Sequence, residues 1–222
     1  NMVGSDYEPN EAVLTKLPQV TLVAVIGPAA VGKTTLMNAA AARCPALHPV
    51  LTTTSRGLRN GEKNDIDAHF RSRKEMKQRI AEHAYVQVSP DVLGDLYATA
   101  SEDYAAEGVA VMAILADAMP TFTSLPFKVV RPIFMLPPSW DAWKRRLADR
   151  HFDTEQYEKR LVEAGQSLRY AIDTPELSFM IADDLAQATL EFTQAALGAD
   201  PVANQFACRD LAATLLKELQ NR

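Results

Sequence analysis

The stretch Gly27-Pro28-Ala29-Ala30-Val31-Gly32-Lys33-Thr34 decides the fold of this chain. It matches the pattern G-x-x-x-x-G-K-[ST] in full, follows an apolar run over residues 20–26 and opens a helical pattern. Glycine at both ends lets the backbone curve around a phosphate with its N–H groups pointing inward, and the following helix adds the positive end of its dipole. The stretch therefore predicts a strand, a phosphate-binding loop and a helix, in that order.

Lys33 and Thr34 carry the chemistry expected of such a loop. Lys33 is placed to reach the β- and γ-phosphates of a nucleotide, and the Thr34 hydroxyl is placed to ligate Mg²⁺. We expect ATP and Mg²⁺ as cofactors. The other predicted nucleotide contacts come from the loop and the first helical turn: Gly27, Ala30, Val31, Gly32 and Thr35.

Composition and charge limit the partners of this loop. The 222 residues are 47% hydrophobic and 23% charged, which is ordinary for a soluble globular protein. The longest apolar stretch, near residues 109–116, is too short to cross a membrane, and residues 1–12 lack the basic start and apolar core of a secretory signal. A net charge of −5 argues against a general nucleic-acid surface. Cys44 and Cys208 lie far apart without metal-ligand spacing, so we expect reduced thiols in a cytoplasmic protein.

Apolar and amphipathic segments alternate along the chain. The pattern predicts strands at residues 20–26, 85–88, 109–116, 129–136 and 179–181, with residues 51–70 irregular. It predicts helices at residues 33–44, 73–84, 101–107, 139–149, 153–170, 185–197 and 201–219. A phosphate loop after the first of several alternating strands and helices predicts an α/β fold of three layers, α/β/α, with a mostly parallel sheet.

Four segments resemble the guanylate kinase family, over residues 22–188. The first, residues 27–35, is common to many kinases. The second, Thr52-Thr53-Thr54-Ser55-Arg56-Gly57-Leu58-Arg59-Asn60-Gly61-Glu62, is similar to the family pattern S-x-T-T-R-x-x-R-x-G-E. The third, Gly94-Asp95-Leu96-Tyr97-Ala98-Thr99, is similar to G-N-Y-Y-G-T. The fourth follows P-P-S…R-L…R-G…R-L, with Pro137-Pro138-Ser139, Arg146-Leu147, Arg150 and Lys159-Arg160-Leu161.

The resemblance implies a division of the chain. We expect a lead-in over residues 1–18, a guanylate kinase-like domain over residues 19–198 and a C-terminal helical extension over residues 199–222. Within the domain, residues 50–100 are expected to form a small acceptor-binding subdomain, and residues 139–172 a helical lid. The expected acceptor contacts are Thr52, Arg56, Arg59, Gln87, Tyr97 and Thr99.

The arginines suit phosphoryl transfer on physical grounds alone. Transfer between two anions needs cations that neutralise both and hold them in line. Arg56 and Arg59 can grip one acceptor phosphate, with the Tyr97 hydroxyl donating to it. Arg146 and Arg150, four residues apart, are predicted to share one helix face and to close with Arg160 over the transferring group.

The departures from the family fall on the residues that read the acceptor base. Gln87 stands where the family has a glutamate that accepts hydrogens from guanine, and Ile114 and Ala116 replace two family aspartates. Asp117 follows one residue late and would need a bulge to serve. Two further family positions are also changed, a tyrosine to Ala68 and an adenine-contacting asparagine to Ala182. Each lost hydrogen bond costs about 1–3 kcal/mol, so we expect weakened guanine selectivity.

Three classes of function remain open from the sequence. The first is an ATP-dependent kinase whose acceptor is GMP or another phosphorylated small molecule, with ribose 1,5-bisphosphate phosphokinase as a sugar-phosphate precedent. The second is a non-catalytic interaction module, and the third, a P-loop switch, lacks its D-x-x-G and N-K-x-D elements here. The intact Lys33, Thr34 and lid arginines favour catalysis. No general base is needed, because a phosphate acceptor is already a nucleophile.

The remaining conspicuous residues have structural interpretations. Trp140 and Trp143 are expected to pack rather than stack on a base, and the four histidines, scattered without ligand spacing, are expected at the surface or in loops. In the C-terminal helix, an apolar stripe is predicted to pack on the core or to form a dimer contact, which leaves monomer and homodimer open. The stripe consists of Phe206, Leu211, Leu215 and Leu219.

Overall fold

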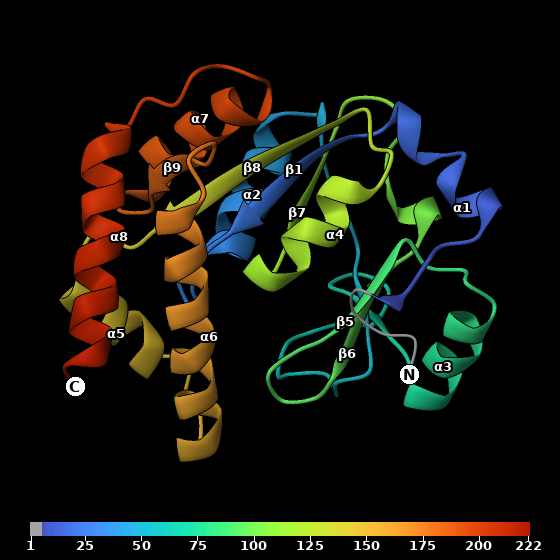
Figure 1. Ribbon diagram of the computed structural model, residues 1–222, viewed down its shortest axis with the longest axis horizontal. Coiled ribbons are helices and arrows are strands. Elements are labelled where there is room, and N and C mark those ends of the chain that lie inside the picture. The colour runs from blue at the N-terminus through green and yellow to red at the C-terminus, as the bar shows by residue number, and fades with distance from the viewer. Residues whose placement is uncertain (1–5) are drawn as a thin grey trace.

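A parallel sheet forms the centre of the molecule. The computed structural model describes residues 6–222, so the first five residues of the predicted lead-in lie outside the described residues. Within residues 6–222 the sheet has five strands, all paired in parallel (Figure 1). In spatial order they are β2 (Leu47–Pro49), β7 (Val109–Ala113), β1 (Thr21–Ile26), β8 (Val129–Leu136) and β9 (Ser178–Ile181).

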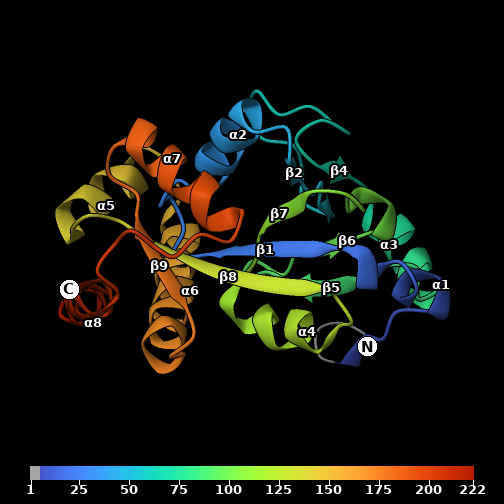
Figure 2. The same cartoon turned by 90° about the horizontal axis from the view of Figure 1, so that it is seen from above.

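Helices cover both faces of this sheet. Because side chains alternate along a strand, Leu22, Ala24 and Ile26 of β1 pack in one buried cluster, and Val23 and Val25 pack in another. The first cluster includes side chains of α4 (Met119–Ser124), α6 (Thr154–Asp173) and α8 (Gln205–Gln220). The second includes α2 (Lys33–Arg43) and α7 (Leu185–Ala196). Figure 2 shows these two helical layers on either side of the strands, and the predicted three-layer fold is confirmed.

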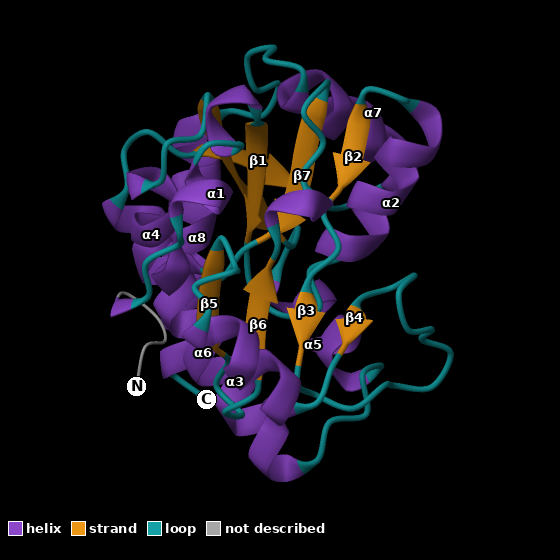
Figure 3. Cartoon of the chain, turned by 90° about the vertical axis from the view of Figure 1, so that its right-hand side faces the viewer, coloured by secondary structure: helices purple, strands orange, loops and turns teal. Residues whose placement is uncertain are grey.

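A smaller sheet lies at one end of the large one (Figure 3). In the described chain it has four strands, in the order β4 (His69–Phe70), β3 (Thr53–Thr54), β6 (Leu96–Thr99) and β5 (Gln87–Pro90). Helix α3 (Arg73–Ala81) buries Met76 and Ile80 against it. A capping box starts α3, since the Ser72 and Glu75 side chains each bond the other residue's backbone N–H. These elements fall within the range predicted for the acceptor subdomain.

Short elements account for most differences from the sequence prediction. The prediction omitted β2, β3, β4, β6, α4 and α1 (Glu11–Leu14), which have two to six residues each, too few to show a periodic pattern. The helix predicted over residues 101–107 is a single 3₁₀ turn, η3 (Ser101–Asp103), and a second such turn, η2, covers Leu17–Gln19. β7 ends at Ala113, before the predicted residue 116, because the chain turns into η4 (Ala116–Ala118). None of the helices in residues 6–222 combines the length and hydrophobicity needed to cross a bilayer.

The C-terminal helix is part of the core. α8 packs along α6, and its buried face is formed by Cys208, Ala212, Leu215 and Leu219. The predicted burial of Leu215 and Leu219 is confirmed, but Phe206 is 86% exposed, so its place in the stripe was wrong. Phe206 precedes Cys208 by two positions, which turns it about 200° away from the buried face.

Candidate active site

The phosphate loop has a backbone that needs its glycines. Gly27 directly follows β1 and has φ +148°, and a Cβ at this position would lie 2.5 Å from the Met135 carbonyl oxygen of β8. Gly32 caps the N-terminus of α2 in the left-handed region with φ +104°. Between them Ala30 has φ +62°. The motif therefore forms the compact turn expected from the sequence, at the carboxyl end of a central strand.

Lys33 lies inside this turn. Its Nζ donates hydrogen bonds to the carbonyl oxygens of Gly27 at 2.6 Å and Pro28 at 2.9 Å. Burial lowers the pKa of Lys33 to about 8, while the Glu163 carboxylate opposes that shift. An anion bound in the loop would therefore stabilise the buried ammonium group of Lys33.

Helix α5 (Trp140–Ala148) holds the outer side of the loop. The Trp143 indole N–H donates to the Ala29 carbonyl at 2.9 Å, and Arg146 donates to the carbonyls of Val31 at 3.2 Å and Ala182 at 2.7 Å. Trp143 is fully buried with Trp140 edge-on to it, so the packing prediction is confirmed. Arg150 lies beyond the end of α5, so the predicted helix face shared by Arg146 and Arg150 was wrong.

Arg56 is held in place before any ligand binds. Its guanidinium makes two hydrogen bonds of 2.7 Å to the Glu62 carboxylate and lies over the Phe70 ring at 5.1 Å. The Arg59 backbone N–H also donates to Glu62, at 2.8 Å. The hydrogen bonds from Arg56, with smaller help from Arg59, lower the pKa of Glu62 to about 2. The carboxylate thus orders the whole turn that carries both arginines.

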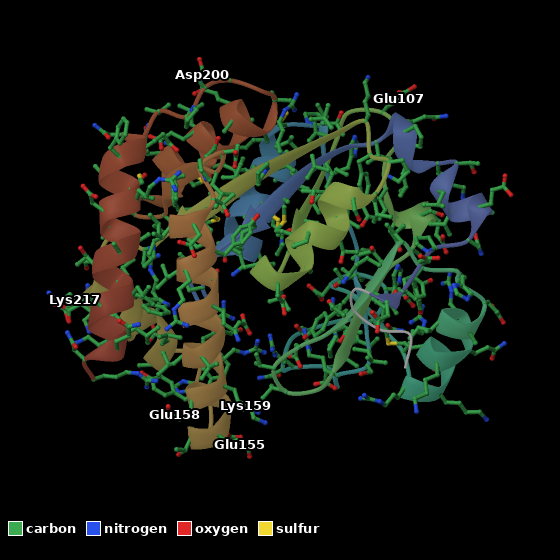
Figure 4. All side chains as sticks on the ribbon, in the orientation of Figure 1. Glu107, Glu155, Glu158, Lys159, Asp200 and Lys217 are labelled. Carbon is green, nitrogen blue, oxygen red and sulfur yellow. The ribbon has the colours of Figure 1, made fainter. Side chains whose placement is uncertain are left out.

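Helix α6 contributes one buried arginine. Arg160 donates to Glu163 at 2.6 Å and to Asp91 at 3.3 Å, and it is 9% exposed. Figure 4 shows Glu155, Glu158 and Lys159 at the outer end of α6, which leaves the start of that helix charged and solvent-facing. Arg160 differs from these neighbours in turning toward the phosphate loop, where its charge acts on Lys33.

These groups surround one cavity of about 360 Å³. Lys33 and Thr34 line it from the phosphate loop, Arg59 from the 56–62 turn, Tyr97 from β6 and Arg160 from α6. Partial burial and, to a smaller extent, the like charge of Arg56 lower the pKa of Arg59. A site with this many cations around one opening is suited to binding two phosphate groups together.

The sequence profile described as guanylate kinase matches residues 19–199. The chain belongs to the guanylate kinase family. A guanylate kinase from Symbiobacterium thermophilum is 29% identical over 178 residues, covering 78% of this chain and 83% of that protein. One from Neisseria meningitidis is 32% identical over 164 residues, covering 71% of this chain and 77% of its own length. Family membership makes the chain an enzyme of the nucleotide kinase class.

A solved structure shares the same fold. The crystal structure of guanylate kinase from Anaplasma phagocytophilum superposes with a TM-score of 0.60 at 18% identity, over 80% of this chain and 84% of that chain. This likeness agrees with the mostly parallel sheet and its covering helices.

Of the positions at which this guanylate kinase family member departs from the family pattern, two reach the cavity. Gln87 and Ile114 both line it, and each is 5% exposed. Ala116 starts the turn η4, which carries Asp117 into a neighbouring cavity of about 250 Å³ that also reaches Gly27 and Asp91. The turn, rather than the bulge considered from the sequence, sets the direction of Asp117.

Most of the predicted site residues meet at the cavity. Those that line it are Gly27, Ala30, Lys33, Thr34, Thr52, Arg59, Gln87, Tyr97, Thr99, Arg150 and Arg160. Among the described residues, five predicted ones are outside its lining: Val31, Gly32, Thr35, Arg56 and Arg146.

Sequence reasoning missed several lining residues. The acids Asp91 and Glu163 and the apolar side chains Met112 and Phe122 all face the cavity. Glu163 could have been found, since it follows Arg160 by three positions on a predicted helix. Phe122 could not, because nothing in the local sequence of α4 indicates which cavity it faces.

Proposed function

We propose that this chain transfers the γ-phosphoryl group of ATP to the phosphate of a small acceptor, GMP or a related monophosphate. One observation carries the proposal: Lys33 of the donor loop and Arg59 and Tyr97 of the acceptor subdomain line the same cavity. In-line transfer requires the two phosphates to be held side by side with their charge compensated.

On the donor side, Lys33 is the central group. In the absence of a phosphate its ammonium bonds only carbonyl oxygens of the loop in the described structure. A bound triphosphate offers oxygens with full negative charge, which favour the protonated lysine and replace those contacts. The backbone N–H groups at the start of α2 add to the same attraction.

Thr34 fits the requirement for a magnesium ligand. Its side chain is exposed at the first turn of α2 and lines the cavity beside Lys33. A hydroxyl is a hard oxygen donor, and a phosphate-bound Mg²⁺ takes one or two protein ligands and completes its shell with water. Bound Mg²⁺ supplies charge neutralisation on the phosphate oxygens.

On the acceptor side, Arg59 and Tyr97 contact the acceptor phosphate, and Arg56 positions the turn from behind. The acceptor phosphate oxygen is itself the nucleophile, so these residues orient it and lower its repulsion with the donor. Arg160 is the group expected to change partners. It moves from Asp91 and Glu163 to the transferring phosphoryl group as the lid closes.

ADP release from ATP and Mg²⁺ tests this function over GMP, other nucleoside monophosphates and sugar phosphates. Lys33→Ala is expected to abolish acceptor-dependent ADP release, whereas Lys144→Ala, at an exposed position of α5, is expected to leave it intact. Absence of acceptor-dependent ADP from every acceptor, together with absence of ATP binding in calorimetry, refutes the proposal. ATP binding without turnover would point instead to a non-catalytic module.

A further inference from the structure

Two strands of the small sheet present a polar ladder to the cavity. Gln87 pairs with Thr99 across β5 and β6, and Ser89 pairs with Tyr97 in the same register. Paired residues share a face of a sheet, and residues two apart on a strand do so as well. All four line the cavity, whereas Val88 between them packs in the core behind the sheet.

Apolar side chains line the same cavity from the large sheet and α4. Met112, Ile114, Ala118 and Phe122 are 1–7% exposed. In the described part of the chain, the cationic lining residues are Lys33, Arg59, Arg150 and Arg160, and they come from the phosphate loop, the 56–62 turn and the lid. The acids Asp91 and Glu163 also line it, and both pair with Arg160. The cavity thus has charged side chains where phosphates would bind, and uncharged side chains around the remainder of the acceptor.

Gln87 is an uncharged polar residue whose side chain is available to a ligand. It is 5% exposed, and its side chain makes no hydrogen bond to any of residues 6–222. The neighbouring Thr99 hydroxyl, by comparison, bonds the Tyr104 hydroxyl at 2.8 Å. The amide is not among the fully buried side-chain polar groups that lack a partner in residues 6–222, so its oxygen and nitrogen are open to the cavity, where a bound molecule can pair with both.

The chemistry of an amide limits what it can read. The Gln87 side chain presents one acceptor beside one donor, and it complements a ring edge that has one donor beside one acceptor. Hypoxanthine and adenine have such edges. The N1–H and 2-amino groups of guanine form a pair of donors, and an amide aligned with that pair sets its own NH₂ donor against one of them. Guanine can still use its O6 and N1–H, but its 2-amino group then makes no hydrogen bond to Gln87.

We propose that Gln87 makes this site select a monophosphate whose buried ring presents one donor beside one acceptor, so that the 2-amino group of guanine contributes no affinity. This inference rests on the phosphotransferase function proposed above and names its acceptor class. It also disfavours a second phosphate in place of the ring, because that charge would lie among Gln87, Ile114 and Phe122 without a cation.

Calorimetric titration and ADP release measure the two proposals separately. Both are run with IMP, AMP, GMP and ribose 5-phosphate on the wild type and three variants. Gln87→Glu replaces the donor by a second acceptor, Gln87→Met removes both, and Gln194→Glu adds the same charge at an exposed position of α7 as a control. The thermal midpoint of each variant shows whether it is folded.

For the wild type we expect IMP or AMP to bind at least as tightly as GMP, and ribose 5-phosphate at least tenfold more weakly. Gln87→Glu is expected to raise the GMP-to-IMP affinity ratio at least tenfold, Gln87→Met to weaken all three nucleotides, and Gln194→Glu to leave the ratio unchanged. A wild-type preference for GMP over IMP of tenfold or more overturns the inference, as does a folded Gln87→Met variant with unchanged affinities. Binding in the expected order without ADP release supports the inference and refutes the kinase function.

Discussion

Replacing Glu62 by glutamine removes the charge that orders the 56–62 turn. In the structure this carboxylate takes two hydrogen bonds of 2.7 Å from Arg56 and one of 2.8 Å from the Arg59 backbone. The side chains of Arg56 and Glu62 are 15% and 22% exposed. Glu62→Gln keeps the shape but leaves an amide that can accept from only one side of the guanidinium.

The size of the effect follows from the pKa of Glu62. Its hydrogen bonds with Arg56 lower that pKa from 4.5 to about 2, and a shift of this size corresponds to about 3 kcal/mol. The pair lies near the surface, where water screens part of the interaction, so we expect the variant to lose about 1–2 kcal/mol of unfolding free energy at pH 7.

The same shift sets the pH dependence. A carboxyl group whose pKa is lower in the folded than in the unfolded state stabilises the protein fully at pH values above its unfolded-state pKa. This contribution disappears as the pH falls toward the folded-state pKa. The difference between wild type and Glu62→Gln is therefore expected at pH 7 and should shrink from about pH 4.5 downward to about pH 2. Urea unfolding followed by circular dichroism at pH 7, 4 and 3 measures it.

Glu102→Gln is the matched control. Glu102 also pairs with an arginine, Arg79, at 3.0 Å, but the two side chains are 56% and 40% exposed. Such exposed pairs contribute roughly 0–1 kcal/mol. Equal destabilisation by the two variants at pH 7, or a Glu62→Gln difference that is unchanged at pH 3, would refute the reasoning.

Three further predictions follow from the same structure. Gly27→Ala should displace the phosphate loop and lower kcat/KM for ATP roughly 100-fold, because the added Cβ would lie 2.5 Å from the Met135 carbonyl oxygen. Gly57→Ala, with open space around the added Cβ, should retain activity in the same ADP-release assay. His69→Asn should cost about 1 kcal/mol of unfolding free energy at pH 6 and progressively less toward pH 8.5. Burial lowers the pKa of His69, but its bonds to Asp103 at 2.9 Å and Asp65 at 2.6 Å outweigh this and raise the pKa, so the stabilisation is lost as the pH rises through the folded-state pKa. Urea unfolding without this trend would contradict the assignment. Glu163→Gln removes the carboxylate whose charge opposes the lowered pKa of Lys33. ATP affinity should therefore decline at a lower pH than in the wild type and be about threefold weaker at pH 8.5 in calorimetry, and an unshifted pH profile would argue against this electrostatic influence.

The elements that were predicted correctly are those with a strong local pattern. β1 and α2 were predictable because the apolar run and the phosphate-loop motif constrain their own backbone, and α6 and α7 because they are long and periodic. The two-residue strands β3 and β4 were not predictable. They are strands only because β6 and the 52–71 segment are brought beside each other by tertiary packing.

The same distinction between local and long-range determinants applies to the residues of the candidate site. Arg59 and Tyr97 could be placed from their motifs, since each motif fixes a local turn. The pairing of Arg160 with Asp91 could not, because Asp91 lies 69 residues before it and the two meet only when α6 packs beside the small sheet. The error on Arg150 had a local cause, as α5 ends at Ala148 and the expected helical spacing no longer applies.

By itself, the sequence determined the fold class, the phosphate loop and the family, because these depend on contiguous residues whose chemistry and spacing act locally. It also showed that Gln87 stands in an altered acceptor site. The tertiary structure alone decided what surrounds that amide: β6 places Thr99 beside it, and Met112 of β7 and Phe122 of α4 line the cavity with it. Those contacts join segments far apart in the chain, and their position depends on how the two sheets pack rather than on any local pattern.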